Sequence, residues 1–434
     1  MSGRSEHEGK VARIAQRLRE RRSSAPLCLH KRAVSHMVPK PHDLRHTDEK
    51  IDISDLDQIL SIDPVRRICV AESGVTFVDL VDATLAYGLV PLVVPELKTI
   101  TVGGAVAGCS LESMSFRHGG FHDTCLEYEV ITAGGDVIVC RPDNENSLLF
   151  QMMHGAFGTL GILSKLTFRL VPAKPFVHVT YETHERLDDY LAAIAAHADW
   201  HGVDFMDGII HSPTKLVLNV GRFVDHAPYT HRHDRWRVYY KSTGRRREDY
   251  LRTEHYLFRY DRGVTNVHPF LSSTAVLRLA ERLHRWLPAD RPRVTLDTFL
   301  PLSRVPAFFD WYRREVRFFP LWCVPYRRVR DYEWIRPSFF AGLTDELFLD
   351  LAIYGMKQPP GKNIHRMIEE ELARVGGIKT LISHNYYSPD EFWSVWNKPN
   401  YDAVKRITDP ANIFRDLYSK TCRAAHGMSD AVNP

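Results

Sequence analysis

The segment from Thr101 to Gly108 (TVGGAVAG) could bind phosphate, because a β-branched pair leads directly into glycines. Glycine lets the backbone approach a ligand without a clash from a Cβ atom, and the N–H groups of such a turn can cradle a diphosphate. The spacing G-G-x-x-x-G is not that of a βαβ dinucleotide-binding unit, and no acidic residue follows at the required distance. Close packing of two elements at Gly104 and Gly108 is the structural alternative.

The pattern around this segment predicts the elements that position it. Four runs read as strands: 66–72, 126–132, 136–140 and 165–171. Residues 77–87 have the apolar spacing of a helix, and Ala133-Gly134-Gly135 is a hairpin signal between two of the strands. Residues 157–162 (FGTLGI) form a second glycine turn directly before the last strand. This succession of turns and strands favours ligand binding over simple packing.

The order of such blocks along nearly the entire chain resembles the FAD-binding PCMH-type (vanillyl-alcohol oxidase) flavoproteins, and most of all their delta-24-sterol reductase branch. The blocks in the first half of the chain are 94–97 (VPEL), 101–104 (TVGG), 112–115 (ESMS), 118–121 (HGGF), 133–135 (AGG), 158–161 (GTLG) and 171–174 (VPAK). Those in the second half are 297–301 (DTFLP), 319–325 (FPLWCVP), 350–355 (DLAIYG), 386–393 (YYSPDEFW) and 401–414 (YDAVKRITDPANIF). This resemblance makes FAD the expected cofactor.

The resemblance implies an α+β fold in three parts. A two-part PCMH-type FAD-binding domain is expected over residues 1–177, and an α+β cap or substrate domain over 178–390. The apolar spacing of Leu187, Tyr190 and Ile194 predicts the first helix of that cap. The C-terminal segment, 391–434, is expected to return to the FAD domain.

The resemblance also implies which residues bind FAD. The expected cofactor-binding residues are Lys31, Arg32, Ser35, Thr101, Val102, Gly103, Gly104, Ala105, Gly108, Ser110, Ser113, Gly119, Phe121, His122, Gly158, Gly161, Ile162, Arg259 and Arg262. Many relatives have a glycine-rich first loop, but residues 29–37 contain no glycine, so Lys31, Arg32 and Ser35 are expected to neutralise and bond phosphate there. His30 or His36 could anchor the flavin covalently. The resembling branch binds FAD noncovalently, and noncovalent binding is expected here.

In chemical terms, the resemblance implies hydride transfer from NADPH or NADH, by way of the flavin, to a carbon–carbon double bond in a sterol side chain or another isoprenoid lipid. An isolated double bond has no carbonyl group to stabilise negative charge, so protonation must precede or accompany hydride transfer, and the site needs an acid. The expected catalytic residues, with the first two favoured as the acid, are Glu112, Tyr386, Tyr354 and Asp261. Each has a structural alternative: Glu112 could cap a helix, and the tyrosines could be core residues with satisfied hydroxyl groups.

Arg259 and Arg262 lie in a segment that resembles the H-Y-x-x-R-x-x-R pattern of the sterol reductases. They could hold an anionic group or stabilise reduced flavin, and an ion pair with Asp261 is the structural alternative. Residues 264–266 (VTN) replace an aromatic pair of that branch, which leaves the identity of the substrate open. Two other functions also stay open: an FAD-linked oxidase or dehydrogenase of an alcohol, and a non-catalytic lipid-binding protein with a flavin fold.

The composition agrees with a soluble enzyme of two or three domains. The 434 residues carry a net charge of +4, which argues against nucleic acid as a partner despite the basic, aromatic run 231–262. No apolar run approaches the ~20 residues of a membrane span, and the charged N-terminus lacks the apolar core of a signal peptide. A cytoplasmic protein is therefore expected, with peripheral membrane contact as an open alternative. Seven cysteines without a C-x-x-C pair indicate reduced thiols and no metal site.

Residues 4–22 combine basic side chains with an apolar stripe at helical spacing, formed by Val11, Ile14, Ala15 and Leu18. This pattern predicts either the first helix of the FAD domain, with a solvated basic face, or a helix that attaches to an anionic membrane surface. We favour the first interpretation.

Overall fold

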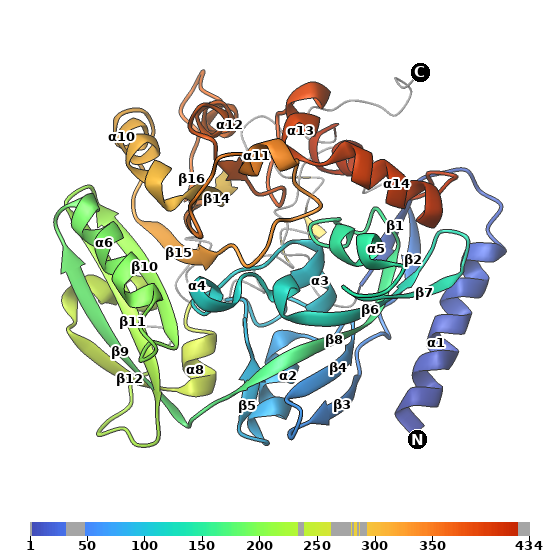
Figure 1. The fold of residues 1–434 in the computed structure, drawn as a ribbon, viewed down its shortest axis with the longest axis horizontal. Coiled ribbons are helices and arrows are strands. Elements are labelled where there is room, and N and C mark those ends of the chain that lie inside the picture. Colours follow the sequence, from blue (N-terminus) through green and yellow to red (C-terminus); the bar gives the residue numbers. More distant parts are fainter. Residues whose placement is uncertain are drawn as a thin grey trace.

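The computed structural model describes residues 2–31, 48–232, 238–261 and 293–423, and also residues 279, 282, 283 and 286 (Figure 1). Two large sheets, each packed against its own helices, form the body of the molecule. This arrangement confirms the α+β fold that was expected.

The first sheet has the strand order β3-β4-β8-β6-β7, with β5 paired to β8. Its strands are β3 (Ile59–Asp63), β4 (Ile68–Glu72), β5 (Leu89–Pro91), β6 (Cys125–Ile131), β7 (Val137–Cys140) and β8 (Ile162–Pro172). The helices of this part are α2 (Phe77–Leu85), α3 (Val102–Ala107), α4 (Ser115–His118) and α5 (Ser147–Met152). The four predicted strands and the predicted helix are confirmed. β6 and β7 form the predicted antiparallel hairpin, and its turn uses Gly135 at a φ of 82°.

Local sequence accounts for these elements. The Thr76 side chain accepts a hydrogen bond from the N–H of Asp79 and so caps the first turn of α2. Along β8 the buried residues Leu166, Phe168 and Leu170 alternate with more exposed ones, as expected for a strand with one face in the core.

The second sheet is antiparallel, with the order β12-β9-β11-β10-β15-β16-β14-β17 and with β13 paired to β16. Its strands are β9 (Phe176–His184), β10 (Phe205–Ser212), β11 (Lys215–Val224), β12 (Glu248–Arg252), β13 (Val294–Leu296), β14 (Thr298–Pro301), β15 (Leu321–Arg327), β16 (Leu347–Met356) and β17 (Ile378–Lys379). Three helices, α6 (Leu187–Ala198), α10 (Val305–Glu315) and α12 (Ile364–Val375), cover one face (Figure 1). The helix predicted from Tyr190 and Ile194 is confirmed as α6, where both side chains are buried.

Side chains alternate between the two faces of this second sheet, so its polar residues gather on one of them. Met206 and Ile210 of β10 pack under the helices, whereas Phe205 and Ile209 join the core of the first sheet. Asp207 therefore faces the first sheet. The same alternation on β15 and β16 places three more residues on this face: Trp322, Asp350 and Tyr354.

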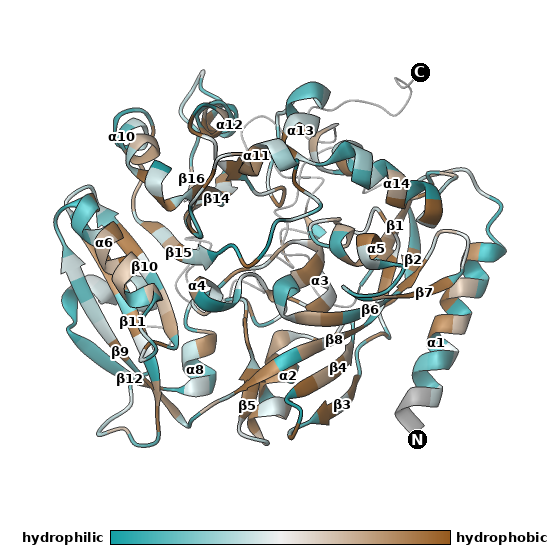
Figure 2. Ribbon diagram, in the orientation of Figure 1, coloured by the Kyte–Doolittle hydropathy of each residue, from teal (hydrophilic) through white to brown (hydrophobic). Residues whose placement is uncertain are grey.

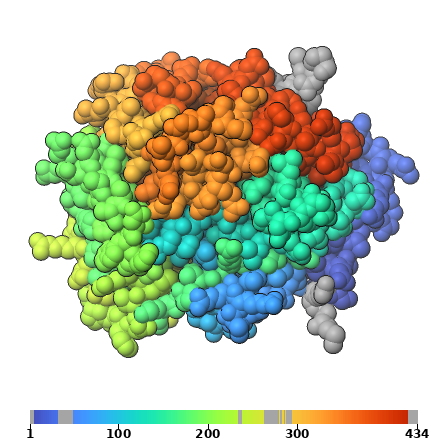
Figure 3. Space-filling view, viewed as in Figure 1, coloured from blue at the N-terminus to red at the C-terminus, as the bar shows by residue number. Residues whose placement is uncertain are grey.

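The C-terminal segment, with α13 (Pro389–Val395) and α14 (Lys398–Thr408), packs against the first sheet. The N–H of Ala133 donates to the carbonyl oxygen of Thr408 at 2.8 Å, and Phe414 forms a β-bridge with Leu27. The space-filling view shows this segment, in red, directly against the blue-green surface of the first part (Figure 3). Domain limits at residues 177 and 390 remain our proposal.

The N-terminal helix α1 (Ser2–Arg19) packs beside the first sheet and next to a parallel strand pair, β1 (Leu27–His30) and β2 (Glu49–Asp52). Its polar and apolar residues alternate around the helix (Figure 2). The stripe of Val11, Ile14, Ala15 and Leu18 is buried in a cluster with Leu27 and Ile131. This confirms the first helix of the FAD part, and the covered stripe is not available to a membrane.

No helix in the described ranges combines the length and the apolar character that crossing a membrane requires.

Candidate active site

The glycine segment Thr101–Gly108 forms a short helix, α3, instead of an open turn. The first three N–H groups of α3 already donate within the protein: Val102 to the carbonyl oxygen of Val75, Gly103 to that of Ser73, and Gly104 to the Thr101 hydroxyl. The interpretation of this segment as a set of exposed N–H groups is therefore wrong for these three. A Cβ atom on Gly103 would lie 2.7 Å from Ser73 Cβ, so close packing is what requires glycine there.

The second glycine turn has a more open geometry. Gly158 adopts a φ of 70°, which favours glycine, and a Cβ atom at this position would point at Leu29 of β1 and lie 3.6 Å from Lys420 Nζ. The exposed Lys31 follows directly after β1. The Gly158 turn, Leu29 and Lys420 thus lie together beside the first sheet, and Lys31 follows two residues after Leu29. Arg32, Ser35, His36 and Arg262 lie outside the described residues.

The other predicted cofactor residues serve mainly to build the walls of the site. The side chains of Val102, Ala105, Phe121 and Ile162 are fully buried in apolar clusters, and Thr101 caps α3. Ser110 bonds through its backbone, since its N–H donates to the carbonyl oxygen of Ala105. Three of the predicted glycines serve close contacts or turns: Gly108 at the end of α3, Gly119 with a φ of 74°, and Gly161 with a φ of 131°.

Glu112 lies between α3 and α4, in a segment that contacts the second sheet, since the N–H of Met206 on β10 donates to the carbonyl oxygen of Ser113 at 2.6 Å. Its carboxyl group is buried, and its Oε1 lies 3.0 Å from Nη2 of the buried Arg259. The N–H and hydroxyl groups of Ser113 both donate to Oε2, so the Ser113 hydroxyl is engaged with Glu112. Burial raises the pKa of Glu112 to about 7, against the opposing effect of Arg259. The structure therefore brings the predicted acid and the predicted arginine together.

A second carboxylate, Asp207 of β10, shares the same guanidinium. Its Oδ1 lies 3.1 Å from Arg259 Nη2. Its Oδ2 accepts hydrogen bonds from the Tyr260 hydroxyl and, at 3.0 Å, from the indole N–H of Trp322. The guanidinium carbon also lies 4.0 Å from the ring centroid of Tyr256 and 4.6 Å from that of Tyr260. Arg259 is thus enclosed by two carboxyl groups and by aromatic rings.

A second acidic group lies further along the same face of the second sheet. The Tyr354 hydroxyl donates to Asp297 Oδ1 at 3.0 Å, and the N–H of Thr298 donates to Asp350 Oδ1 at 3.2 Å. Burial, with Asp297 nearby, raises the pKa of Asp350. Burial likewise raises the pKa of Tyr354, so this hydroxyl keeps its proton at neutral pH.

Trp322 and Glu96 connect the two groups. The Trp322 ring centroid lies 4.9 Å from that of Tyr260 and 6.3 Å from that of Tyr354. Burial raises the pKa of Glu96 to about 7, and the charge of Asp261 adds to this rise. The predicted Asp261 is buried beside them and accepts the N–H of Lys98 at 3.3 Å.

Tyr386, the other favoured acid, contacts Glu369 and His365. Its N–H donates to Glu369 Oε1 at 3.0 Å, and its ring lies 6.1 Å from that of His365. Burial and the Glu369 charge raise the pKa of its hydroxyl group. Glu369 also binds Lys379 Nζ at 2.5 Å. These contacts form a separate polar group, so the structure gives Tyr386 less support as the acid than Glu112.

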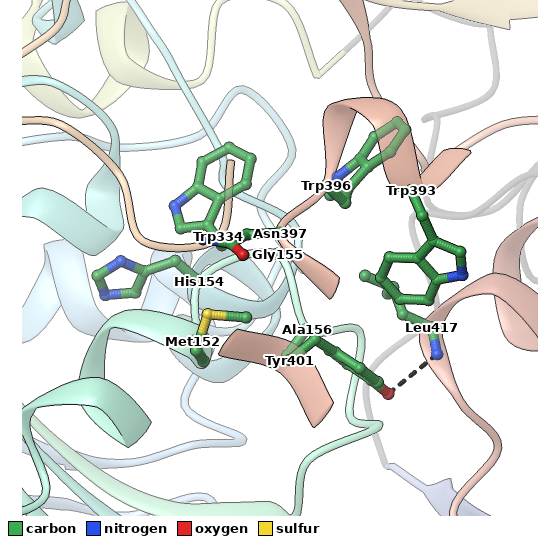
Figure 4. A pocket seen from close by; sticks show the side chains of 10 residues that line it. All are labelled: Met152, His154, Gly155, Ala156, Trp334, Trp393, Trp396, Asn397, Tyr401 and Leu417. Carbon is green, nitrogen blue, oxygen red and sulfur yellow. Dashed lines mark hydrogen bonds between the residues drawn. The ribbon is translucent and has the colours of Figure 1, made fainter. Parts of the chain in front are cut away.

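His122 lies beside an aromatic pocket. Its ring is buried, 3.3 Å from Asp123 Oδ2 and 4.8 Å from the ring of His154, and burial lowers the pKa of both histidines. His154 lines a pocket of about 260 Å³, open mouth included, between α5 and the two C-terminal helices (Figure 4). Four aromatic side chains form most of its wall: Trp334, Trp393, Trp396 and Tyr401. None of the four predicted catalytic residues lines this pocket.

Sequence reasoning missed Glu96, Asp207 and Asp350 as members of the site. Asp207 stands in FMDGII and Asp350 in FLDLAI, so each is an acidic residue within an otherwise apolar strand. A carboxyl group at such a position is buried with its strand and needs a partner. The sequence therefore indicated that these carboxyl groups are buried, but it did not indicate which side chains pair with them.

The residues present fit FAD in two respects. The Gly158 turn with Lys31 and Lys420 offers a close backbone approach and positive charge, which suit a diphosphate. Arg259 Nε is a buried donor without a hydrogen-bond acceptor among the described residues, and a flavin carbonyl oxygen can accept from such a group.

Comparison with known proteins agrees with this geometry. Residues 35–141 match the family described as FAD binding domain. The chain is 24% identical to a Delta(24)-sterol reductase of Homo sapiens over 96% of this chain and 87% of the relative. It is 26% identical to a Delta(24)-sterol reductase homolog of Caenorhabditis elegans, over 87% of this chain and 78% of the relative. A Delta(24)-sterol reductase of Pisum sativum is 25% identical over 96% of this chain and 84% of its own length. The chain is therefore an FAD-dependent oxidoreductase with a PCMH-type FAD-binding domain, similar over most of its length to the Delta(24)-sterol reductases of animals and plants.

Proposed function

We propose that the protein reduces a carbon–carbon double bond in a sterol side chain or another isoprenoid lipid, with NADPH or NADH as the electron donor. The names of its relatives support the reaction class. The observation that carries the proposal is the buried Glu112, an acid with a pKa of about 7 held against Arg259 on the face between the two sheets.

Hydride transfer from the nicotinamide to a carbon atom of the substrate is the chemistry that bound FAD would supply. We propose that Lys31, Lys420 and the Gly158 turn hold its diphosphate, and that Arg259 holds the flavin ring. Thr101, α3 and the residues packed around them keep this wall rigid, because their polar groups are already satisfied.

Glu112 supplies the proton that an isolated double bond needs. A carboxyl group with a pKa near 7 is substantially protonated at neutral pH, and it is a far stronger acid than a tyrosine. The rings of Tyr260 and Trp322 can stabilise positive charge that develops at carbon. Tyr354 on Asp297 is the second proton donor that we propose for this site.

An isoprenoid substrate dissolves in membranes, so we propose that the protein takes it up by peripheral contact with a membrane. The stripe of α1 is buried and does not serve this contact. A cytoplasmic location stays a prediction.

The reaction is tested with the FAD-loaded protein under anaerobic conditions. Mixing with NADPH or NADH is expected to bleach the visible absorption of the flavin, and a sterol with an unsaturated side chain is then expected to restore it and to yield the saturated product in mass spectrometry. Absence of bleaching with either nicotinamide would refute the proposal. Oxygen consumption with alcohols in place of bleaching would support the alcohol oxidase instead.

The role of Glu112 is tested with Glu112→Gln, which keeps the shape of the side chain and removes the acid. Bleaching by the nicotinamide is expected to continue, whereas re-oxidation by the sterol slows by about 100-fold or more. Glu127→Gln is the control. Glu127 lies on β6, outside the site, and pairs with Arg141. Sterol reduction by Glu112→Gln at the unchanged rate would show that another group is the acid.

A further inference from the structure

A thiol and an amine, two groups that can react with each other after oxidation, meet on the parallel strands β1 and β2. Cys28 and Lys50 lie directly opposite each other in the register of this strand pair. Lys50 Nζ donates to Cys28 Sγ, and the two atoms are 2.6 Å apart. Atoms that react within one molecule are typically held about 3–3.5 Å apart before the bond forms. The fold therefore brings this sulfur and this nitrogen within the distance that bond formation requires.

The packing of the two strands fixes this pair. Leu27 and Ile51, which are next to the pair in sequence, are buried in the apolar cluster shared with α1. On the same face as the pair, His30 Nδ1 lies 3.2 Å from Asp52 Oδ1. A shift of one residue in either strand would turn its buried apolar side chain to the other face. The register is thus set by burial, and it keeps the amine beside the thiol.

The surroundings of Cys28 differ from those of other cysteines of the chain. Cys28 is 7% exposed and Lys50 is exposed, so the pair lies at the surface of the first part. Cys109, Cys125 and Cys140 have backbone carbonyl oxygens near their sulfur atoms, and burial raises the pKa of all three thiols. A thiol is oxidised through its thiolate form, so burial protects these three.

We propose that Cys28 and Lys50 form a reversible covalent link when the protein meets hydrogen peroxide. In the first step the Cys28 sulfur attacks the peroxide, the O–O bond breaks, and a sulfenic acid and water form. In the second step the neutral Lys50 amine attacks the sulfur atom. An S–N bond forms, the S–O bond breaks, and the hydroxyl group leaves as water with one proton of the amine. Overall the sulfur is oxidised by two electrons and the peroxide is reduced to water.

The link joins the two ends of a segment in the FAD-binding part. β1 ends at His30, directly before Lys31, Arg32 and Ser35, which are expected to bind the diphosphate, and β2 begins after this segment at Glu49. A covalent link holds β1 to β2 in addition to the hydrogen bonds between them. A role in cofactor binding rests on the proposed function, but the link itself rests on the contact between the two side chains.

The test treats the FAD-loaded protein with hydrogen peroxide, without nicotinamide or sterol, and maps its peptides after digestion with trypsin. Trypsin does not cleave after a modified lysine, so the expected product is peptide 23–31 joined to peptide 46–66, with a mass about 2 Da below the sum of the two. Dithiothreitol added before digestion is expected to abolish this product, because it reduces the S–N bond. Recovery of Cys28 as a free thiol, as a sulfenic acid trapped by dimedone or as a sulfinic acid, with Lys50 cleaved normally, overturns the proposal.

Lys50→Arg removes the amine and keeps the positive charge. A guanidinium group stays protonated and is a poor nucleophile, so no link is expected in this variant. The matched control is Lys165→Arg: Lys165 Nζ contacts a carboxylate, 2.8 Å from Glu129 Oε2, and the variant is expected to form the link as the unmodified protein does.

Protein unfolded in urea before the peroxide is added shows whether the fold is needed. No link is expected there, because the strand register that brings Cys28 and Lys50 together is lost. The same yield of linked peptide in urea, or a link at Cys28 in Lys50→Arg, contradicts the proposal. Since these experiments use neither nicotinamide nor sterol, their failure is distinct from failure of the reductase assay.

Discussion

At the scale of single residues, burial decides what Arg259 and the two carboxyl groups can do. In water such charges would be screened and would titrate near their ordinary values. Between the two sheets Glu112 and Arg259 are almost fully buried, and the pKa of Glu112 rises to about 7. The same three side chains on a surface would form an ordinary ion-pair network without a useful proton.

Gly103 gives a prediction at this scale. In Gly103→Ala the new Cβ atom would lie 2.7 Å from Ser73 Cβ and 2.9 Å from the Ser73 carbonyl oxygen, which is backbone and cannot move aside. We expect a loss of about 1–3 kcal/mol in the free energy of unfolding, measured in urea. The control Gly9→Ala has no atom within 4 Å of the new Cβ and lies inside α1, so it is expected to be neutral or to gain about 0.5–1 kcal/mol. Equal stability of both variants would contradict the close-contact explanation.

At the scale of elements, α1 is held on the first sheet by buried ion pairs as well as by its apolar stripe. His7 lies between Glu72 of β4 and Glu129 of β6, 2.8 Å from each, and Lys10 Nζ lies 3.0 Å from Glu72. Burial lowers the pKa of His7, but the hydrogen bonds with Glu129 and Glu72 outweigh this effect and raise it to about 9. His7 is therefore positively charged at neutral pH and bridges two strands.

The pH dependence of stability tests this bridge. The pKa of His7 is higher in the folded protein than in the unfolded chain, so its contribution is complete below about pH 6.5 and is lost as the pH rises through 9. His7→Gln is expected to lose about 1–3 kcal/mol in the free energy of unfolding at pH 6, and to lack the decline between pH 6.5 and 9. Arg13→Gln, which removes an exposed pair with Asp55, is the control with little effect. If the free energy of unfolding of His7→Gln falls between pH 6.5 and 9 as much as that of the unmodified protein, the fall is due to other groups.

At the scale of the whole molecule, the chain closes on itself near the proposed FAD site. Arg415 donates to both carboxylate oxygens of the buried Asp48, and Lys405 Nζ donates at 2.8 Å to the carbonyl oxygen of Thr159 in the second glycine turn. The C-terminal segment thus binds the start of the first part and supports the turn that we assign to the diphosphate.

Arg415→Met tests this closure. It leaves the Asp48 carboxylate buried without its cation, so we expect a loss of about 3–5 kcal/mol in the free energy of unfolding. We also expect weaker retention of FAD on a desalting column, because the neighbouring turn is less well supported. Arg406→Met, at an exposed position on α14, is expected to change neither quantity. Full retention of FAD by Arg415→Met would show that the Arg415–Asp48 pair does not contribute to cofactor binding.

The sequence by itself determined the strands, the hairpin at Gly135, helices α2 and α6, and the cofactor. These features depend on apolar spacing and turn residues within a few positions of one another, or on motifs in fixed order along the chain, and both can be read locally. The covered stripe of α1 was predicted for the same reason.

Only the tertiary structure decided which side chains meet. The N–H groups of Val102 and Gly103 donate to Val75 and Ser73, and the segment forms a short helix where its sequence suggested an open turn. Asp207, Glu112 and Arg259 come from three separate elements, and Tyr386, equally attractive in the sequence, lies with Glu369 instead. The physical reason is that strand register and sheet packing set these contacts, and a shift of one residue in β10 would turn Asp207 to the other face.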